Sequence, residues 1–255
     1  MSDFPMLAEG TCQQILPAKR AVGDNIPMRL DDYGNLLNSN IMVKKHGLTA
    51  EGSQFVTTNP TPGTGIAGAI SATYGVTHPW MVLRNNGSTG GPTAYLDYLK
   101  FIVTVVPAGS TTFDLAVVRD VIAGGALTTD HMAYATPVNL NPLSTGSSKC
   151  TLGYLTGATA NTIAALTPAA AVVGRGTIGG LTIAGDQLIA DFGAMDPSPW
   201  PASTAAEGAA QPGCRATMFP PICCPPGYQL LFYYWGLTNS GTALSYEFEF
   251  SHFER

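Results

Sequence analysis

The feature that most constrains the fold is a strict alternation of apolar and polar residues near the end of the sequence. Leu244, Tyr246, Phe248 and Phe250 alternate there with serines and glutamates. A period of two turns successive side chains to opposite faces of a strand, so that one face meets a core and the other meets water. Residues 244–253 are therefore predicted to form a strand of an antiparallel sheet.

The same period recurs earlier in the chain. Residues 95–106 place Leu99, Phe101 and Val103 on one face, and a Pro-Ala-Gly-Ser turn then leads into a second alternating run, residues 111–119. We expect these two segments to form a hairpin. Further strands are predicted at residues 78–84, 177–183, 187–192 and 228–235, with the second and third of these as a pair.

Strands punctuated by turns predict an all-β fold. About eight to ten strands are expected, with no convincing amphipathic helix. Only 11% of the residues are charged, whereas Gly (29) and Pro (19) are abundant, which is typical of strands joined by turns. A chain of 255 residues can form one large all-β domain. We expect an antiparallel β-sandwich or jelly roll with an extended N-terminal arm.

The domain boundary is predicted near residue 50. Residues 1–50 contain three prolines and little regular periodicity, so we interpret them as an extended N-terminal arm with a short hairpin at residues 26–37. Residues 51–255 would form the β-sandwich or jelly-roll domain. Within it, residues 51–68 and 196–213 are rich in proline and small residues, and are predicted to be long surface loops.

Charge and hydropathy narrow the range of partners. The net charge is −5 with only 12 Lys and Arg, which argues against nucleic-acid binding because that requires clustered cations. The beginning of the sequence lacks the pattern of a signal peptide, and no run of about twenty apolar residues is uninterrupted. We therefore expect a soluble protein with no membrane partner, whose partners are proteins or sugars.

No cofactor, metal ligand or catalytic residue is predicted. The five cysteines form no C-x-x-C pair and are interpreted as reduced, mostly buried thiols, and the four histidines lack the spacing of a metal site. Glu247 and Glu249 would lie about 7 Å apart on one strand face, a separation that suits a glycoside-cleaving pair. Such pairs are routine on a solvated strand face, however, so we expect a non-enzymatic protein.

An aromatic run at residues 232–235 offers another possible contact. The strand period places Phe232 and Tyr234 on one face, and Tyr233 and Trp235 on the other. Either face could stack on sugar rings or pack against another subunit, but core packing is the more frequent use of such side chains.

Three segments carry a resemblance to a known class of protein. They are residues 26–37, residues 83–99 with their Leu-Arg-Asn-Asn and Tyr-Leu-Asp-Tyr-Leu runs, and a Pro-Pro-Gly strand followed by the closing Tyr-Glu-Phe-Glu-Phe run. In these segments the chain resembles β-rich structural proteins of tailed-bacteriophage virions. The resemblance implies a capsid cement or decoration subunit, often a homotrimer, assembled in the host cytoplasm. It would lie on the capsid surface in contact with the major capsid protein or other virion subunits.

Such proteins attach through N-terminal arms and have no catalytic residues. A shell-forming jelly-roll major capsid protein is the nearest variant of this hypothesis. The alternative from a different class is a carbohydrate- or receptor-binding tail module that uses Trp80, Trp200 or Trp235, and a glycoside-active enzyme comes third. For the leading hypothesis, the predicted interface residues are Phe4, Met6, Leu7, Ile15, Leu16 and Trp200.

Overall fold

The computed structural model describes residues 44–67, 78–106, 113–122, 127–157, 161–163, 165–178, 183–193, 214–236 and 245–255. Met1–Lys44 and Lys45–Arg255 are separate units, and the described strands all belong to the second. The end of the predicted arm forms a short helix, α1 (Lys44–Ala50), whereas the predicted hairpin at residues 26–37 lies outside the described residues. Within the described part of the chain, no helix has the length and apolar character needed to cross a lipid bilayer.

Two large sheets build the domain, and this confirms the predicted all-β class. The first sheet has eight strands, and only its β12–β13 pair is parallel. Its main path is β13 (Cys214–Met218), β12 (Gln187–Asp191), β4 (Ala94–Val105), β16 (Ser245–Glu254), β1 (Gln54–Thr58) and β8 (Val138–Asn139), with β14 (Cys223–Cys224) beside β4 and β2 (Ile66–Ala67) beside β16.

The second sheet has six strands, all antiparallel. A separate two-stranded sheet pairs β6 (Leu127–Thr129) with β10 (Thr162–Ile163). The order in the six-stranded sheet is β11 (Ala171–Ile178), β5 (Phe113–Val121), β15 (Tyr228–Gly236), β3 (Met81–Asn85), β9 (Cys150–Leu155) and β7 (Met132–Ala135).

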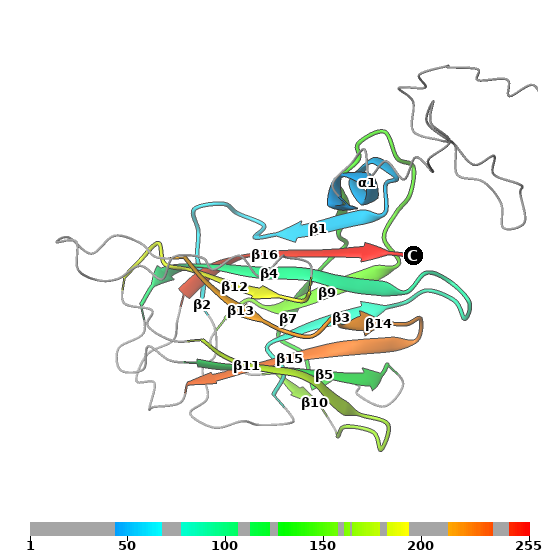
Figure 1. The fold of residues 1–255 in the computed structure, drawn as a ribbon. Coiled ribbons are helices and arrows are strands. Elements are labelled where there is room, and N and C mark those ends of the chain that lie inside the picture. The colour runs from blue at the N-terminus through cyan, green and yellow to red at the C-terminus, as the bar shows by residue number, and fades with distance from the viewer. Residues whose placement is uncertain are drawn as a thin grey trace, which may run out of the picture. The chain divides into compact units, whose positions relative to one another are not determined.

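The two large sheets pack face to face around the main core, as the layers in Figure 1 show. The Phe248 ring of β16 lies 4.9 Å from the Tyr154 ring of β9, and the Phe250 ring lies 5.9 Å from that of Phe232. Phe248 and Phe250 therefore lie on the core-facing side of β16, as the alternation predicted. Burial of such large rings on both inner faces is the main source of stability of the two layers.

The six-stranded sheet is also buried on its outer face, around a second core. Tyr233 and Trp235 of β15 pack there with Ile163 of β10 and with Val118, whereas Phe232 faces the main core. Strands that are buried on both faces read as continuous apolar runs, not as alternating ones. This explains why residues 230–235 of β15 are an uninterrupted apolar and aromatic run, whereas β16 shows a strict alternation.

Eight of the described strands pair in a nested order, whereas β9 and β13 pair outside it. When β1, β3, β4, β5, β11, β12, β15 and β16 are counted in chain order, the first pairs with the eighth, the second with the seventh, the third with the sixth and the fourth with the fifth. The first and third of these pairs belong to the eight-stranded sheet, and the other two belong to the six-stranded sheet.

Two predicted strand pairings are wrong. The strands β4 (Ala94–Val105) and β5 (Phe113–Val121) do form in the two predicted segments, but they lie in opposite sheets, so they are not a hairpin. Likewise β12 pairs with β4 on one side and with β13 on the other, so it does not pair with residues 177–183, of which 179–182 lie outside the described residues. Alternation reports which face of a strand is buried, but it carries no information about the neighbouring strand.

The predicted long loop at residues 51–68 is also wrong in part. It contains β1, which lies between β16 and β8, and the short strand β2. The strand β1 was not predicted because a Pro- and Gly-rich run follows Thr58, although the Phe, Val and Thr residues of β1 favour β structure.

Candidate functional site

The apolar residues predicted from the sequence to make subunit contacts lie outside the described residues. Their contacts therefore stay a prediction, and a candidate site has to be built from the residues that the structure places. The residues concerned are Phe4, Met6, Leu7, Ile15, Leu16 and Trp200.

Two of the tryptophans considered for sugar binding are buried. The Trp80 indole lies in the main core and donates a hydrogen bond of 2.6 Å to the Tyr246 hydroxyl. Trp235 lies in the second core, with the Arg175 guanidinium 5.6 Å from its ring centre. Neither side chain offers an open ring face to a sugar. Core packing, the more frequent use of such an aromatic run, is therefore confirmed for residues 232–235.

The two glutamates considered as a glycosidase pair have partners within the fold. Glu247 accepts a hydrogen bond of 3.0 Å from the backbone amide of Gly63. Glu249 accepts one from the Tyr98 hydroxyl and lies 3.3 Å from the Lys100 ammonium. Burial of the phenol, and then its contact with Glu249, raises the pKa of Tyr98 above its ordinary value. These contacts join β16 to neighbouring segments and account for both carboxylates without catalysis.

A group of exposed apolar side chains lies at the β8 end of the eight-stranded sheet. Val138, Leu140 and Leu143 are 65%, 41% and 90% exposed. No charged residue occurs between His131 and Lys149 in the sequence. We call residues 138–143, together with Thr49 and Ala50 of α1, the β8 surface. A charge-free apolar patch of this kind has the composition of the centre of a protein interface.

Asparagine side chains hold the β8 surface in a defined shape. The Asn139 side chain donates hydrogen bonds to the carbonyls of Gly52 (2.8 Å) and Gly146 (3.0 Å). Its side-chain oxygen accepts a hydrogen bond from the backbone amide of Asn141. Asn141 accepts a hydrogen bond from the Leu143 amide in the same way. Asparagines form such local turns readily. The apolar side chains are therefore presented by a loop that is bonded to the rest of the domain.

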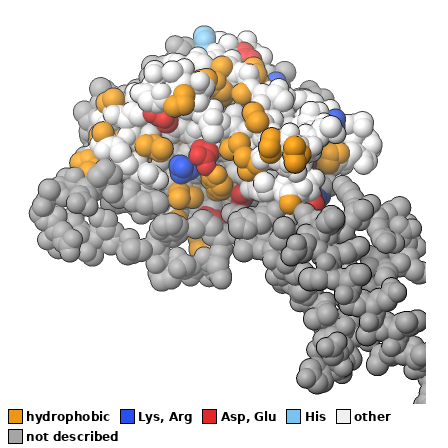
Figure 2. Space-filling view, turned by 90° about the horizontal axis from the view of Figure 1, so that it is seen from above, with side chains coloured by type: hydrophobic (Ala, Val, Ile, Leu, Met, Phe, Trp, Pro, Cys, Tyr) orange, Lys and Arg blue, Asp and Glu red, His pale blue; other side chains and the backbone are white. Residues whose placement is uncertain are grey.

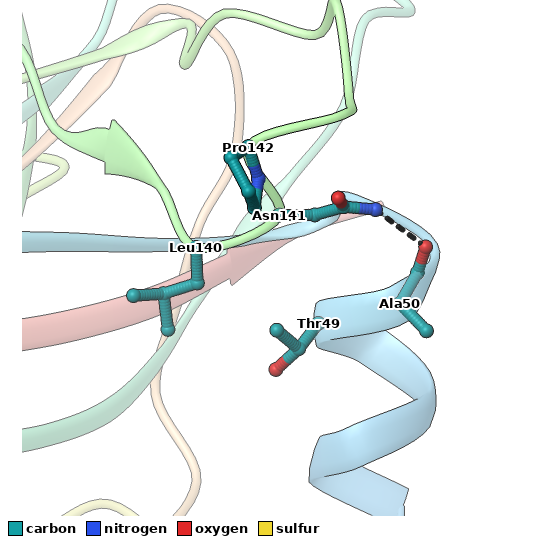
Figure 3. A pocket seen from close by; sticks show the side chains of 5 residues that line it. All are labelled: Thr49, Ala50, Leu140, Asn141 and Pro142. Carbon is teal, nitrogen blue, oxygen red and sulfur yellow. Dashed lines mark hydrogen bonds between the residues drawn. The ribbon is translucent and has the colours of Figure 1, made fainter.

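An open pocket of about 450 Å³ lies between α1 and this loop. Figure 3 shows the Asn141 amide donating to the Ala50 carbonyl, at 2.9 Å, while the Leu140 and Thr49 side chains face the space between the two elements. None of the five lining residues, which also include Pro142, has a titratable group. The pocket suits an apolar side chain of a partner better than a reaction.

The face of the domain seen from above is largely uncharged. Figure 2 shows hydrophobic side chains spread among neutral polar ones on this face, with only a few acidic and basic groups. This distribution agrees with the low share of charged residues, 11%, in the whole chain. Removing water from a surface with few charges costs little free energy, which favours contact with another protein.

A second group of chemically active side chains lies in the interior, between the two sheets. Glu254 accepts hydrogen bonds from the Ser148 hydroxyl (2.5 Å) and the Lys149 amide (3.0 Å to each oxygen), and its Oε1 lies 3.2 Å from Nε2 of His252. Burial alone would raise the pKa of Glu254, but these donors outweigh it and lower the pKa to about 2. The carboxylate is therefore ionised in the interior.

Cys150 lies beside this carboxylate. Burial, and then the negative charge of Glu254, raises the pKa of the Cys150 thiol above its ordinary value. A protonated, buried thiol is a poor nucleophile. The arrangement of thiol, imidazole and carboxylate is therefore unsuited to covalent catalysis on an external substrate. Among the described cysteines, Cys150, Cys223 and Cys224 are free thiols, and Cys150 and Cys224 are buried.

Sequence reasoning missed both groups. For the β8 surface, the signal was the absence of charge between His131 and Lys149, combined with the Asn-x-Asn spacing at 139 and 141. For the interior group, the signal was the His-x-Glu spacing at the end of β16, because residues two apart share one face of a strand. The contribution of Cys150 depends on sheet packing, and no local pattern encodes that.

No protein-family model matches the chain, and neither a curated protein nor a solved structure matches it.

Proposed function

We propose that this chain is a non-enzymatic virion structural protein, a capsid cement or decoration subunit that stabilises a phage head through contacts between subunits. The observation that carries the proposal is the β8 surface, where three large apolar side chains are exposed on a loop fixed by hydrogen bonds. Exposed apolar side chains that gather at one place on a surface are typical of protein–protein contact sites. The resemblance of the sequence to β-rich tailed-phage proteins supports the virion as its location.

The occupant proposed for the β8 surface is a second copy of this chain, in a homotrimer. Copies that each carry a net charge of −5 repel one another in general. The β8 surface is a place where two copies can approach without opposing like charges, because it contains no ionisable side chain. The residues that precede α1 would then form the arm that reaches neighbouring subunits of the shell.

The strand order favours a second candidate, a shell-forming capsid protein. Nested antiparallel pairing across two facing sheets is the arrangement of a jelly roll, a long hairpin rolled up on itself, and we propose that name for the fold. Viral capsid domains are built on jelly rolls, but so are lectins and cupins, so the fold alone does not fix the function. Both candidates place the chain in a virion, and they differ in what the chain assembles into.

Light scattering on the full-length chain after size-exclusion chromatography tests both candidates. The cement hypothesis predicts a discrete trimer, and the capsid variant predicts closed shells. Val138→Thr combined with Leu143→Ser should shift either assembly toward monomer, with an unchanged far-ultraviolet circular dichroism spectrum. The matched control is Val172→Thr, because Val172 is 61% exposed but lies in the other sheet, on β11.

A monomer at every concentration tested would refute the proposal, and a monomer that binds glycans would favour a tail module. Loss of assembly in the Val172→Thr control as well would show that the β8 surface has no special role. Deleting residues 1–25 tests the arm separately. The shortened chain should keep its β spectrum but no longer be incorporated into virions, and retained incorporation would exclude the arm as the attachment device.

A further inference from the structure

The interior group at the end of β16 brings together three side chains that commonly bind metals. One ligand atom from each of Cys150, His252 and Glu254 lies within 4.8 Å of the other two. The three residues are 2%, 0% and 8% exposed. Cys150 comes from the six-stranded sheet, whereas His252 and Glu254 come from the eight-stranded sheet, so the group spans the main core.

The distances suit a small tetrahedral ion. Bonds of about 2.0 to 2.3 Å to zinc separate neighbouring ligand atoms by about 3.3 to 3.8 Å. From a limit of 4.8 Å, each ligand atom has to move by about 1 Å or less to reach that geometry. Side-chain rotations alone can supply such a movement, so the backbone of the two sheets already holds the ligands at the right spacing.

Nε2 is the imidazole nitrogen that faces the other ligands, because it lies 3.2 Å from Oε1 of Glu254. This distance is close to the separation of neighbouring ligand atoms around a tetrahedral zinc ion. An ion on Nε2 would leave the proton of the neutral imidazole on Nδ1, which is buried and has no hydrogen-bond partner among the described residues.

Charge balance selects a divalent ion. One thiolate and one carboxylate carry two negative charges, so a divalent cation makes the buried site neutral and lowers the cost of burial. Sulfur and nitrogen ligands disfavour calcium and magnesium, which prefer oxygen, and favour zinc or a similar transition metal.

We propose that Cys150, His252 and Glu254 bind one divalent transition-metal ion, with zinc the best match to this set of ligands. Binding forms the sulfur–metal bond and releases the thiol proton of Cys150 to solvent, while the imidazole binds in its neutral form. The ion joins β9 to the end of β16 and thereby cross-links the two sheets. It has a structural role and requires no catalytic function.

Cobalt(II) titration of the full-length protein, after treatment with a chelator, tests the site. Cobalt in a tetrahedral site with a thiolate gives visible d–d bands and a sulfur-to-metal charge-transfer band. We expect these bands to saturate at one equivalent and to disappear on addition of zinc. At a hundredfold excess over its Kd, zinc should also raise the melting temperature by about 5–10 °C.

Cys150→Ser should abolish the bands and the zinc-dependent stabilisation. Cys224→Ser is the matched control, because Cys224 is an equally buried free thiol of the same core that lies outside the group. The absence of bands in the natural chain, or their survival in Cys150→Ser, overturns the proposal. If Cys150→Ser does not fold, Glu254→Gln decides the matter: we expect its cobalt affinity to fall at least about tenfold, and an unchanged affinity counts against the site.

Discussion

Replacing Tyr246 by Phe removes a single hydroxyl that links the two sheets across the core. This hydroxyl accepts the hydrogen bond of 2.6 Å from the Trp80 indole, and both residues are buried. The phenylalanine ring can keep the contacts of the tyrosine ring, whose centre lies 5.2 Å from that of Trp80 and 5.6 Å from that of Phe101. The change therefore isolates the polar part of the interaction.

The expected cost is about 2 kcal/mol of unfolding free energy. Tyr246→Phe leaves the Trp80 N–H buried without an acceptor, which costs about 1–3 kcal/mol. For a domain of roughly this size, 1 kcal/mol corresponds to about 2–4 °C in melting temperature, so we expect a fall of about 4–8 °C. In a Trp80→Phe background the same change should cost much less, because no N–H is then left unpaired, and the coupling energy should be about 1–2 kcal/mol.

Urea denaturation followed by far-ultraviolet circular dichroism measures these differences without relying on tryptophan emission. Tyr95→Phe is the control, because Tyr95 is partly exposed on β4 and its replacement should change stability by less than about 0.5 kcal/mol. A cost below about 0.5 kcal/mol for Tyr246→Phe would refute the reasoning. So would a cost that is equal in the two backgrounds.

Three further predictions concern other parts of the core. Asn85→Ala should destabilise the domain by about 2–4 kcal/mol in urea denaturation, because the buried amide bonds two carbonyls and one backbone N–H; a cost below about 1 kcal/mol would contradict this. Gly176→Ala should lower stability by about 1–3 kcal/mol in thermal denaturation, because the added carbon would lie 2.6 Å from a threonine methyl group, whereas Gly157→Ala meets nothing within 4 Å and should be neutral. Burial raises the pKa of Cys224 to about 12, so its thiolate is scarce at pH 8. Iodoacetamide at that pH should therefore modify Cys223 at least about a hundredfold faster in the native protein, as peptide mass spectrometry can measure, and equal rates would exclude the described burial.

The individual strands could be predicted from the sequence because their patterns are local. The alternation in β16 and β4 fixed which residues face the core, and Leu99, Phe101, Phe248 and Phe250 are all buried there. The continuous apolar run of β15 indicated a strand as well, although its burial on both faces depends on the second core.

The strand partners could not be predicted, because pairing depends on long-range packing. β4 and β5 are consecutive and separated by a turn-like segment, which locally resembles a hairpin, yet each pairs with strands distant in the sequence. β1 was missed because its pairing with β16 stabilises a segment whose own sequence is only five residues long. Tertiary context overrides local preference in such short strands.

The two candidate groups could not be predicted for the same reason. Leu143 is an ordinary leucine in a polar loop until the hydrogen bonds of Asn139 and Asn141 fix its direction toward solvent. Cys150 and His252 are far apart in the sequence and meet only because β9 and β16 lie in facing sheets. When the residues of a group come from two sheets, no single segment of the sequence contains all of them.

The pairing of β1 with β16 also has a consequence for biosynthesis. A ribosome adds about 5–20 residues per second, so β1 emerges roughly 10–40 s before the strand that completes it. The apolar side chain of Phe55, which ends up stacked on His252, has no such partner during that interval. The nested order therefore delays completion of the sheets until β16 has been synthesised, and we expect the nascent chain to depend on chaperones until β16 leaves the ribosome.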